Sequence, residues 1–273
     1  MSHLGKRTHP KAQTFFKGLW VAAILGLGVT TSSVASDLGG TPRVIKIHEN
    51  ISQKTLGRIQ LTLTHFKNLD PFPAGLIVLL DSPGGDGDAA MAIGRLLRQN
   101  NAHIFVTRRC DSACVFILMG GVVRAANPGT VGVHSGRLTV MTHDGNVIKE
   151  IDASNNLNNA FQLTSFNTAI RQYIREMGIK HGILDVMLSQ PPNRLYKLSA
   201  TDLLQFNVNG IKNDYLNQRF SDLSQRGYIS NATQDQFKRR TLSTPKECGQ
   251  FVSSDQRFID CYRRALQGRS HQP

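Results

Sequence analysis

Two short apolar runs separated by a helical pattern constrain the fold of this chain more than any other feature. Residues 75–81 and 103–107 are almost continuously apolar, and Pro73 and Pro83 bound the first run. Strands of a parallel sheet have this composition because both of their faces are covered. Between the runs, residues 86–99 carry apolar side chains at helical spacing. This strand–helix–strand order predicts an α/β fold with a largely parallel, buried sheet and crossover helices.

The rest of the chain extends this prediction. We predict strands at residues 43–48 and 131–133, and a hairpin formed by residues 138–141 and 146–148. We predict helices at residues 51–69, 115–119, 154–177, 183–188 and 200–206, the last capped by Ser199. Residues 154–177 have a long apolar face, which we expect to pack on the core or on a second subunit.

Three segments differ in composition and predict the domain organisation. Residues 1–35 begin with four cations and no acid, continue with 13 apolar residues and end in small residues. This is the layout of a secretory signal peptide, with cleavage after Ala35 or Ser36. Thirteen apolar residues are short for a membrane span, so an uncleaved anchor is the less favoured alternative. We expect one α/β domain over residues 36–211 and a basic, helical C-terminal extension, not a second catalytic domain, over residues 212–273.

The chain has a strongly basic balance, with a formal net charge of +13. Without residues 1–35, 28 of its 32 Lys and Arg remain against 19 Asp and Glu, which leaves +9. The cations are spread along the chain, and no helix-turn-helix, RNP or zinc-finger pattern is present. We therefore expect no nucleic-acid partner; an anionic envelope surface is the simpler partner for a basic exported protein.

All four cysteines lie after the predicted signal peptide, which suggests two disulfides formed outside the cytosol. Three connectivities are possible, and the local one, Cys110 with Cys114 and Cys248 with Cys261, is the simplest. A bridge between residues four apart requires Cys110 to lie before the helix, because the Cβ separation of about 5–6 Å in a regular helix is too long. Neither pair has the C-x2-C spacing of zinc sites, so we expect no metal. We also expect no cofactor.

Three motifs fall at predicted strand ends and together indicate nucleophilic catalysis. Ser112 stands in C-D-S-A-C between a strand and a helix, D-S-P-G-G ends the preceding strand, and His134 follows residues 131–133. A serine hydroxyl needs a base and donors for the oxyanion. His134 is the candidate base, and the amides of Gly85 and Ala113 are the candidate donors. Singly, each motif is more commonly structural: a helix cap, a core histidine and a turn.

The stretch from Arg43 to Ile211 resembles the Clp protease proteolytic-subunit superfamily, within the ClpP/crotonase fold. D-S-P-G-G resembles the family's oxyanion turn, residues 104–121 its strand, nucleophile and helix, and V-G-V-H-S-G the strand before its catalytic histidine. L-S-A-T-D-L-L resembles a segment near the family's C-terminus. The resemblance implies repeated β-β-α units, Ser112 as nucleophile, His134 as base, and Gly85 and Ala113 as the oxyanion hole. The C-x-S-A-C variant with a signal peptide looks most like an exported branch of the superfamily.

The chain departs from the family pattern at the catalytic acid and before the nucleophile. Leu195 occupies the position of the acid; Asn193 is the nearest replacement, because an amide can orient a histidine, and Asp185 is the alternative. Arg108 and Arg109 replace a glycine. The family forms rings, so the resemblance implies a homo-oligomer. No P-loop is present and an exported protein meets no ATP-driven unfoldase, so we expect short or unfolded peptides as substrates.

The sequence leaves three functional readings. The first is an exported serine peptidase or esterase-like hydrolase that uses Ser112 and His134. The second is a catalytically silent fold that serves as a periplasmic binding or scaffold protein, which the missing acid favours. The third is an acyl-CoA enzyme of the crotonase type, which an exported location and an idle serine oppose. For the cysteines around Ser112 there are two alternatives. Their disulfide is a redox-sensitive clamp on the turn that carries the nucleophile, or it is a crosslink that only stabilises the fold. Asp86 and Asp88 fit a helix start better than a metal site.

Overall fold

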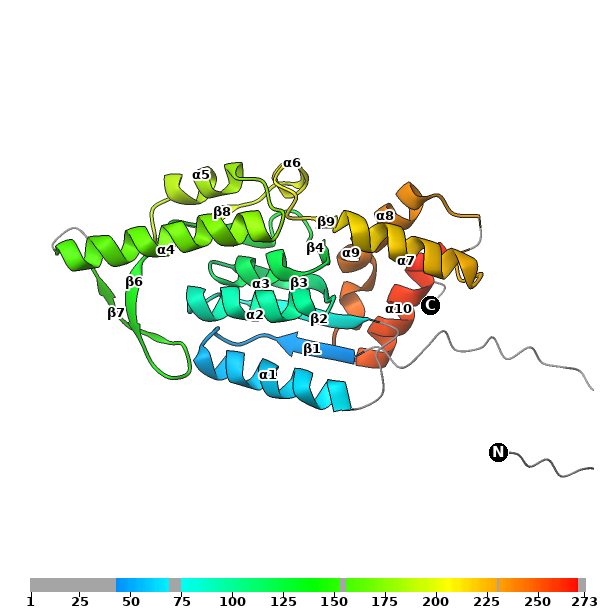
Figure 1. Cartoon of the computed structure of the whole chain (residues 1–273), viewed down its shortest axis with the longest axis horizontal. Coiled ribbons are helices and arrows are strands. Elements are labelled where there is room, and N and C mark those ends of the chain that lie inside the picture. Colours follow the sequence, from blue (N-terminus) through cyan, green and yellow to red (C-terminus); the bar gives the residue numbers. More distant parts are fainter. Residues whose placement is uncertain (1–42, 69–74, 153–155, 230, 270–273) are drawn as a thin grey trace, which may run out of the picture. The chain divides into compact units, whose positions relative to one another are not determined.

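The computed structural model describes residues 43–68, 75–152, 156–229 and 231–269 (Figure 1). The described residues form one compact unit. The predicted signal peptide lies outside the described residues.

The described residues contain a seven-stranded, mostly parallel sheet. Its main path runs β1-β2-β3-β4-β9, and β5 and β8 branch from β3. Its strands are β1 (Arg43–Ile47), β2 (Leu76–Ser82), β3 (His103–Asp111), β4 (Val123–Ala125), β5 (Val131–Val133), β8 (Tyr196–Lys197) and β9 (Gly210–Ile211). β1 to β5 pair in parallel, whereas the two-residue strands β8 and β9 pair antiparallel. The predicted α/β class with a largely parallel sheet is therefore confirmed.

Strand β3 is longer than the sequence predicts, and the extra residues fork the sheet. We expected it to end at Thr107, but it continues through the exposed Arg108 and Arg109, which face Asp81 of β2 at 3.5 and 3.9 Å. The first three residues of β3 pair with β4 and the last two pair with β5. This fork places the end of β5 beside the end of β3.

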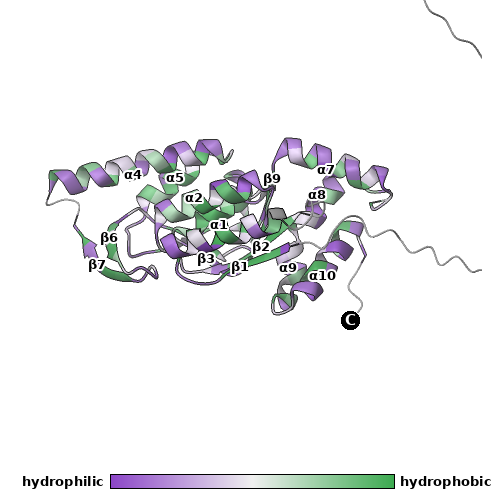
Figure 2. Cartoon of the chain, turned by 60° about the horizontal axis from the view of Figure 1, so that its bottom comes forward, coloured by the Kyte–Doolittle hydropathy of each residue, from purple (hydrophilic) through white to green (hydrophobic). Residues whose placement is uncertain are grey.

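Side chains alternate between the two faces of the sheet and build two separate cores. Ile45, Val78 and Ile104 belong to one core, whereas their neighbours Ile77 and Phe105 belong to the other. The period of two is that of a strand whose faces are both covered. The apolar colour of the central strands in Figure 2 reflects this double burial.

Six helices pack around the first core. They are α1 (Gln53–Asn68), α2 (Gly87–Gln99), α3 (Cys114–Gly120), α4 (Leu157–Glu176), α5 (Gly182–Ser189) and α6 (Ala200–Gln205). All of them were predicted, with shifted ends. The Asp86 side chain caps α2 by accepting hydrogen bonds from the Asp88 and Ala89 amides. The prediction that Asp86 lies at a helix start is therefore confirmed. Ser199 caps α6 as predicted.

The C-terminal extension covers the opposite face of the sheet. Its helices are α7 (Asn213–Gln225), α8 (Gln234–Leu242), α9 (Thr244–Cys248) and α10 (Asp255–Gln267), with a 3₁₀ turn at Gly249–Phe251. Phe258 and Tyr262 of α10 contact Phe105 of β3, with ring centroids 5.9 and 5.1 Å apart. The predicted helical extension is confirmed, and it shares the second core with the sheet.

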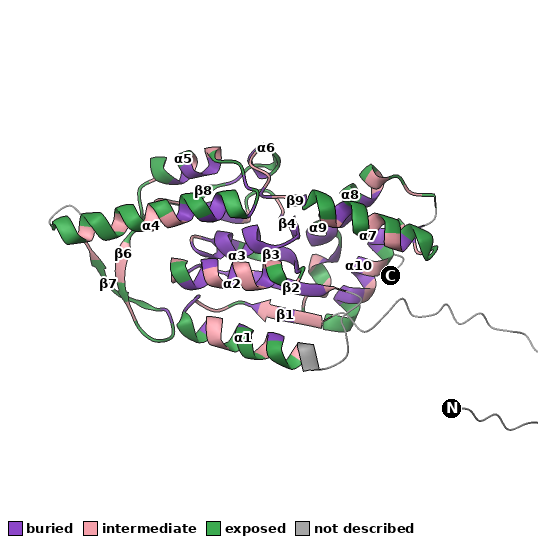
Figure 3. Cartoon of the chain, in the orientation of Figure 1, coloured by how far each residue is buried: buried purple, intermediate pink, exposed green. Residues whose placement is uncertain are grey.

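The hairpin and the first half of α4 are largely exposed (Figure 3). Strands β6 (Leu138–Met141) and β7 (Val147–Ile151) form the predicted hairpin. Ile170, Tyr173 and Ile174 of α4 are buried in the core, whereas Leu157 and Phe161 are 92% and 70% exposed. Among the described helices, none combines the length and apolarity that crossing a bilayer would require.

Candidate active site

The candidate residues lie at the carboxyl ends of three neighbouring parallel strands. Gly84 and Gly85 follow β2, Ser112 follows β3, and His134 follows β5. Ligands bind at this edge in open α/β sheets, because loops after parallel strands converge there. The structure thus brings together the residues that the sequence singled out across 50 positions.

The glycine turn after β2 requires glycine at both positions. Gly84 and Gly85 have φ of +103° and +140°, which side chains disfavour. A Cβ on Gly84 would lie 2.7 Å from the Cβ of Ser112, and one on Gly85 would lie 2.3 Å from the carbonyl oxygen of Ile51. The turn can therefore approach the serine only because both residues lack side chains.

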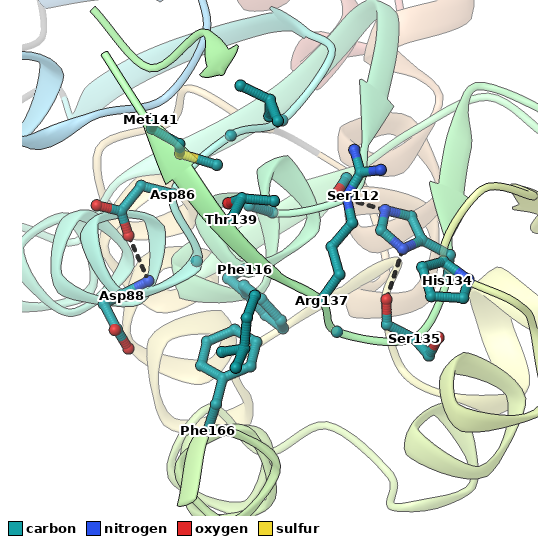
Figure 4. Close-up of a pocket in the computed structure, with 18 of the residues that line it drawn as sticks. Asp86, Asp88, Ser112, Phe116, His134, Ser135, Arg137, Thr139, Met141 and Phe166 are labelled. Atoms are coloured by element: carbon teal, nitrogen blue, oxygen red, sulfur yellow. Dashed lines mark hydrogen bonds between the residues drawn. The ribbon is translucent and has the colours of Figure 1, made fainter. Parts of the chain in front are cut away.

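Ser112 occupies a sharp turn between β3 and α3. Its φ is +55°, in the left-handed region that residues other than glycine rarely adopt. Its amide donates to the carbonyl of Gly132 on β5 at 2.8 Å, which ties the turn to the strand that carries His134. Ser112 is half-buried, with its hydroxyl at the cavity wall (Figure 4).

The Ser112 hydroxyl and the His134 ring form a hydrogen-bonded pair. Ser112 Oγ lies 2.7 Å from His134 Nε2, and His134 Nδ1 lies 2.6 Å from the carbonyl oxygen of Ser135. A carbonyl can only accept, so Nδ1 carries the ring proton. The neutral ring then presents an unprotonated Nε2, which accepts from the Ser112 hydroxyl (Figure 4).

The residue beside Nδ1 differs from the sequence expectation. The carbonyl of Ser135 takes the place that we assigned to Asn193 or Asp185. Asn193 lines the same cavity but is exposed, and Asp185 lies on the outer face of α5, whose Ile183, Leu184 and Met187 point into the core. No sequence signal reveals a backbone carbonyl, because every residue carries one.

Two backbone amides near Ser112, those of Gly85 and Ala113, donate no hydrogen bond among the described residues. Ile51 donates to the carbonyl of Gly84 and accepts from the amide of Asp86, at 2.8 and 2.9 Å. Alternate peptide groups of an extended segment point to opposite sides, so the Gly85 N–H faces away from Ile51. Among the hydrogen bonds of the described residues, neither this amide nor that of Ala113 has an acceptor.

Charged groups surround the pair without contacting the serine. Asp111, buried beside Ser112, binds Lys197 of β8 at 2.5 Å, and Arg137 pairs with Glu150 of the hairpin. Burial is the largest influence on His134 and lowers its pKa below 6.5; the Ser135 carbonyl and Asp111 oppose this shift, and Arg137 reinforces it. His134 is therefore a neutral base at neutral pH.

A large cavity opens beside Ser112 and His134. Its volume is about 1250 Å³, and its walls come from the glycine turn, the hairpin, α3 and α4. Phe116 and Phe166 form an apolar wall, and Arg137 reaches toward the serine–histidine pair (Figure 4). The cavity thus has an apolar wall, and the ion-paired Arg137 lies near the hydroxyl.

Both cysteine pairs are disulfides, with the local connectivity. Cys110 bonds Cys114 and Cys248 bonds Cys261, with Cα separations of 5.1 and 5.7 Å. Cys110 belongs to β3 and Cys114 begins α3, so the first bridge spans the strand-to-helix turn that carries Ser112. Disulfides are compatible with an exported protein.

Comparisons with known proteins place the chain only distantly. No protein-family model matches it, and no curated protein matches. It is similar to a solved mutant of ClpP1 from Listeria monocytogenes, with 16% identity, a TM-score of 0.47 and coverage of 61% of this chain and 88% of that one. It is also similar to a mutant of a membrane-bound stomatin-specific protease, with 20% identity, a TM-score of 0.42 and coverage of 65% and 85%.

Proposed function

We propose that this protein is a serine hydrolase, a ClpP-like peptidase, with Ser112 as nucleophile and His134 as general base. The observation that carries the proposal is the 2.7 Å hydrogen bond between Ser112 Oγ and His134 Nε2. It joins a serine in a strained turn to a histidine whose tautomer leaves Nε2 free to take a proton.

The mechanism follows from the geometry. Ser112 Oγ attacks the carbonyl carbon of the substrate and transfers its proton to His134 Nε2. The oxyanion accepts hydrogen bonds from the amides of Gly85 and Ala113, which have no acceptor among the described residues. His134 then protonates the leaving amine. In the second half of the reaction His134 takes a proton from water, which attacks the acyl-enzyme, and then returns a proton to Ser112 Oγ as the acyl group leaves.

The Ser135 carbonyl has the role that a carboxylate has in a triad. It holds the ring in the productive tautomer, and replacing a triad Asp by Asn costs about 10⁴-fold in kcat largely because that tautomer is lost. A neutral carbonyl stabilises the developing imidazolium less than a carboxylate does. We therefore expect a correctly oriented but slow hydrolase.

We infer that the substrates are short or unfolded peptides, cleaved without ATP. The cavity of about 1250 Å³ exceeds the 300–1,000 Å³ range of small-molecule pockets and suits an extended chain. Export to an oxidising compartment is part of this proposal, because the two disulfides are stable there.

The proposal is tested with a fluorophosphonate probe, which reacts covalently with activated serines. We expect one adduct on the oxidised wild type, mapped to Ser112 by mass spectrometry, and loss of labelling in Ser112→Ala and His134→Ala. Ser165→Ala is the matched control, because Ser165 is an exposed serine that lines the same cavity from α4. An unlabelled wild type with native circular dichroism would reject the hydrolase and favour the silent scaffold.

A further inference from the structure

The backbone of Ser112 is the starting point. Four described residues other than glycine have positive φ, and the other three are Asn101, Asn207 and Asn231. Asparagine tolerates this region, whereas serine does so at a cost. A feature of the surrounding structure must therefore hold Ser112 in this conformation.

The Cys110–Cys114 disulfide encloses Ser112 in a small covalent ring. The two Cα atoms are 5.1 Å apart, whereas four extended residues would span about 13 Å. The chain between them must fold back, which leaves its three central residues few backbone conformations. Both ends of the ring are anchored, since the Cys110 amide donates to Thr130 O at 2.8 Å and Cys114 is buried in the first core.

The position of the cysteines has a geometric reason. In strand–turn–helix nucleophile elbows of the G-x-S-x-G type, small residues stand two positions before and two after the serine, because the strand and the helix come close there. Cys110 and Cys114 occupy these two offsets around Ser112. In this chain a disulfide joins the two positions at which G-x-S-x-G elbows have small side chains.

This bridge is poorly placed to stabilise the whole fold. It joins residues four apart, whereas Cys248–Cys261 joins residues thirteen apart, and the entropic gain of a crosslink grows with the loop that it closes. Its principal effect is therefore on the turn itself.

We propose that the Cys110–Cys114 disulfide positions Ser112 for reaction, so that its reduction lowers the reactivity of the serine while the fold persists. This inference rests on the proposed function of Ser112. Reduction by a dithiol transfers two electrons and two protons: the S–S bond breaks to give two thiols, and the dithiol becomes a disulfide. Both sulfurs belong to fully buried residues, so exchange requires local opening of the turn.

The experiment uses a chain that carries only this bridge. In Cys248→Ala/Cys261→Ala, reduction with dithiothreitol and reoxidation with oxidised glutathione act on Cys110 and Cys114 alone. We measure the rate constant of fluorophosphonate labelling at Ser112, the melting temperature and hydrogen–deuterium exchange of the peptide around residue 112. We expect reduction to lower the labelling rate about 10- to 100-fold, as misplacement of a catalytic group does, and reoxidation to restore it.

A second variant covers failure of the first to fold. Cys110→Ala/Cys114→Ala retains the other bridge and is expected to show the same slow labelling with faster exchange at the turn. Labelling that stays within about twofold after complete reduction would overturn the inference, even if the melting temperature falls. If the oxidised wild type is never labelled, the proposed hydrolase fails instead, and unchanged exchange around residue 112 on reduction would then reject the positioning role separately.

Discussion

His134 binds a backbone carbonyl where we expected the side chain of Asn193 or Asp185. The ring nitrogen that a triad acid would bind is bonded to the Ser135 carbonyl at 2.6 Å, within the same loop. Because the carbonyl carries no charge, the pKa of His134 depends more strongly on burial and on nearby charges than the pKa of a histidine bonded to a carboxylate does. Arg137, which lines the cavity, and its ion-pair partner Glu150 are two of those charges.

The reactivity of Ser112 should therefore follow the protonation of His134. Burial lowers the pKa of His134 below 6.5, so we expect the labelling rate to rise with pH through an apparent pKa below 6.5 and then level off. Arg137→Gln removes a cation that lowers this pKa and leaves Glu150 unpaired, and both changes favour the imidazolium. The ascending limb should move to higher pH, as measured by labelling rates across the pH range.

Arg137→Lys is the control for this pH dependence, because it keeps the positive charge and should leave the limb near its wild-type position. A limb that moves to lower pH in Arg137→Gln would contradict the electrostatic account of His134.

At this scale the sequence predicts side chains better than it predicts backbone contacts. Ser112, His134 and the two glycines come together as their motifs suggested, because strand ends in a parallel sheet converge. The predictions of Asn193 and Asp185 rest on their closeness to Leu195, the position of the acid in the resembled family, and on side-chain chemistry. The group that binds Nδ1 is a carbonyl, and its identity depends on the path of the loop after His134, which no residue type encodes.

Among the elements, α6 shows why a family-like segment has its sequence. In L-S-A-T-D-L-L, Ser199 accepts a bond from the amide of Asp202, and the Asp202 carboxylate accepts from the amide of Ser199, at 3.1 and 2.9 Å. This capping box satisfies two amides that a helix start would leave unpaired. Helix geometry therefore explains why Ser199 and Asp202 occur at these two positions.

Ser199→Ala should lower the free energy of unfolding by about 1 kcal/mol, the usual cost of losing an N-cap side chain. Urea denaturation monitored by circular dichroism measures it. Ser224→Ala on α7 is the matched control: Ser224 is exposed inside a helix, and the change should stay within about 0.5 kcal/mol. Equal destabilisation by the two variants would contradict the role of the cap.

The elements that the sequence misses are those whose signal is short or mixed. Strand β4 has three residues and β8 and β9 have two, fewer than a periodic pattern needs. The sequence predicts the end of strand β3 at Thr107, four residues too early, because Arg108 and Arg109 interrupt its apolar run. Their side chains are exposed beside Asp81, so the strand continues through them without burying a charge.

For the molecule as a whole, the C-terminal extension is part of the fold's support, not an appendage. Residues 212–273 are rich in charge, but their apolar residues share the second core with the sheet. The helical spacing of these apolar residues does not reveal which surface they cover. The sequence therefore predicts that these residues are helical but not that they form the second core. The contact is also polar: His103 of β3 binds Tyr262 of α10 through Nδ1 at 2.9 Å and Tyr215 of α7 through Nε2 at 2.6 Å.

This buried histidine should make the stability of the entire fold sensitive to acid. Burial, with a smaller contribution from Arg219, lowers the pKa of His103 from 6.5 to about 3. Between these values the unfolded chain binds a proton that the folded chain does not, so its contribution to stability is complete above pH 6.5 and is lost as the pH falls. The expected loss is about 1.4 kcal/mol per pH unit.

His103→Gln keeps a donor and an acceptor for the two tyrosines but cannot titrate. The contributions of the other titrating groups cancel when the wild type and the variant are compared. Urea denaturation from about pH 4.5 to 5.5, where the unfolded histidine is almost fully protonated, should give the wild type a slope steeper by about one proton than that of the variant. Should the variant not fold, the His103 ring proton resonances of the wild type decide the matter: they should not titrate above about pH 4.5, and a midpoint near 6.5 would show that the histidine between the sheet and the extension is not buried as described.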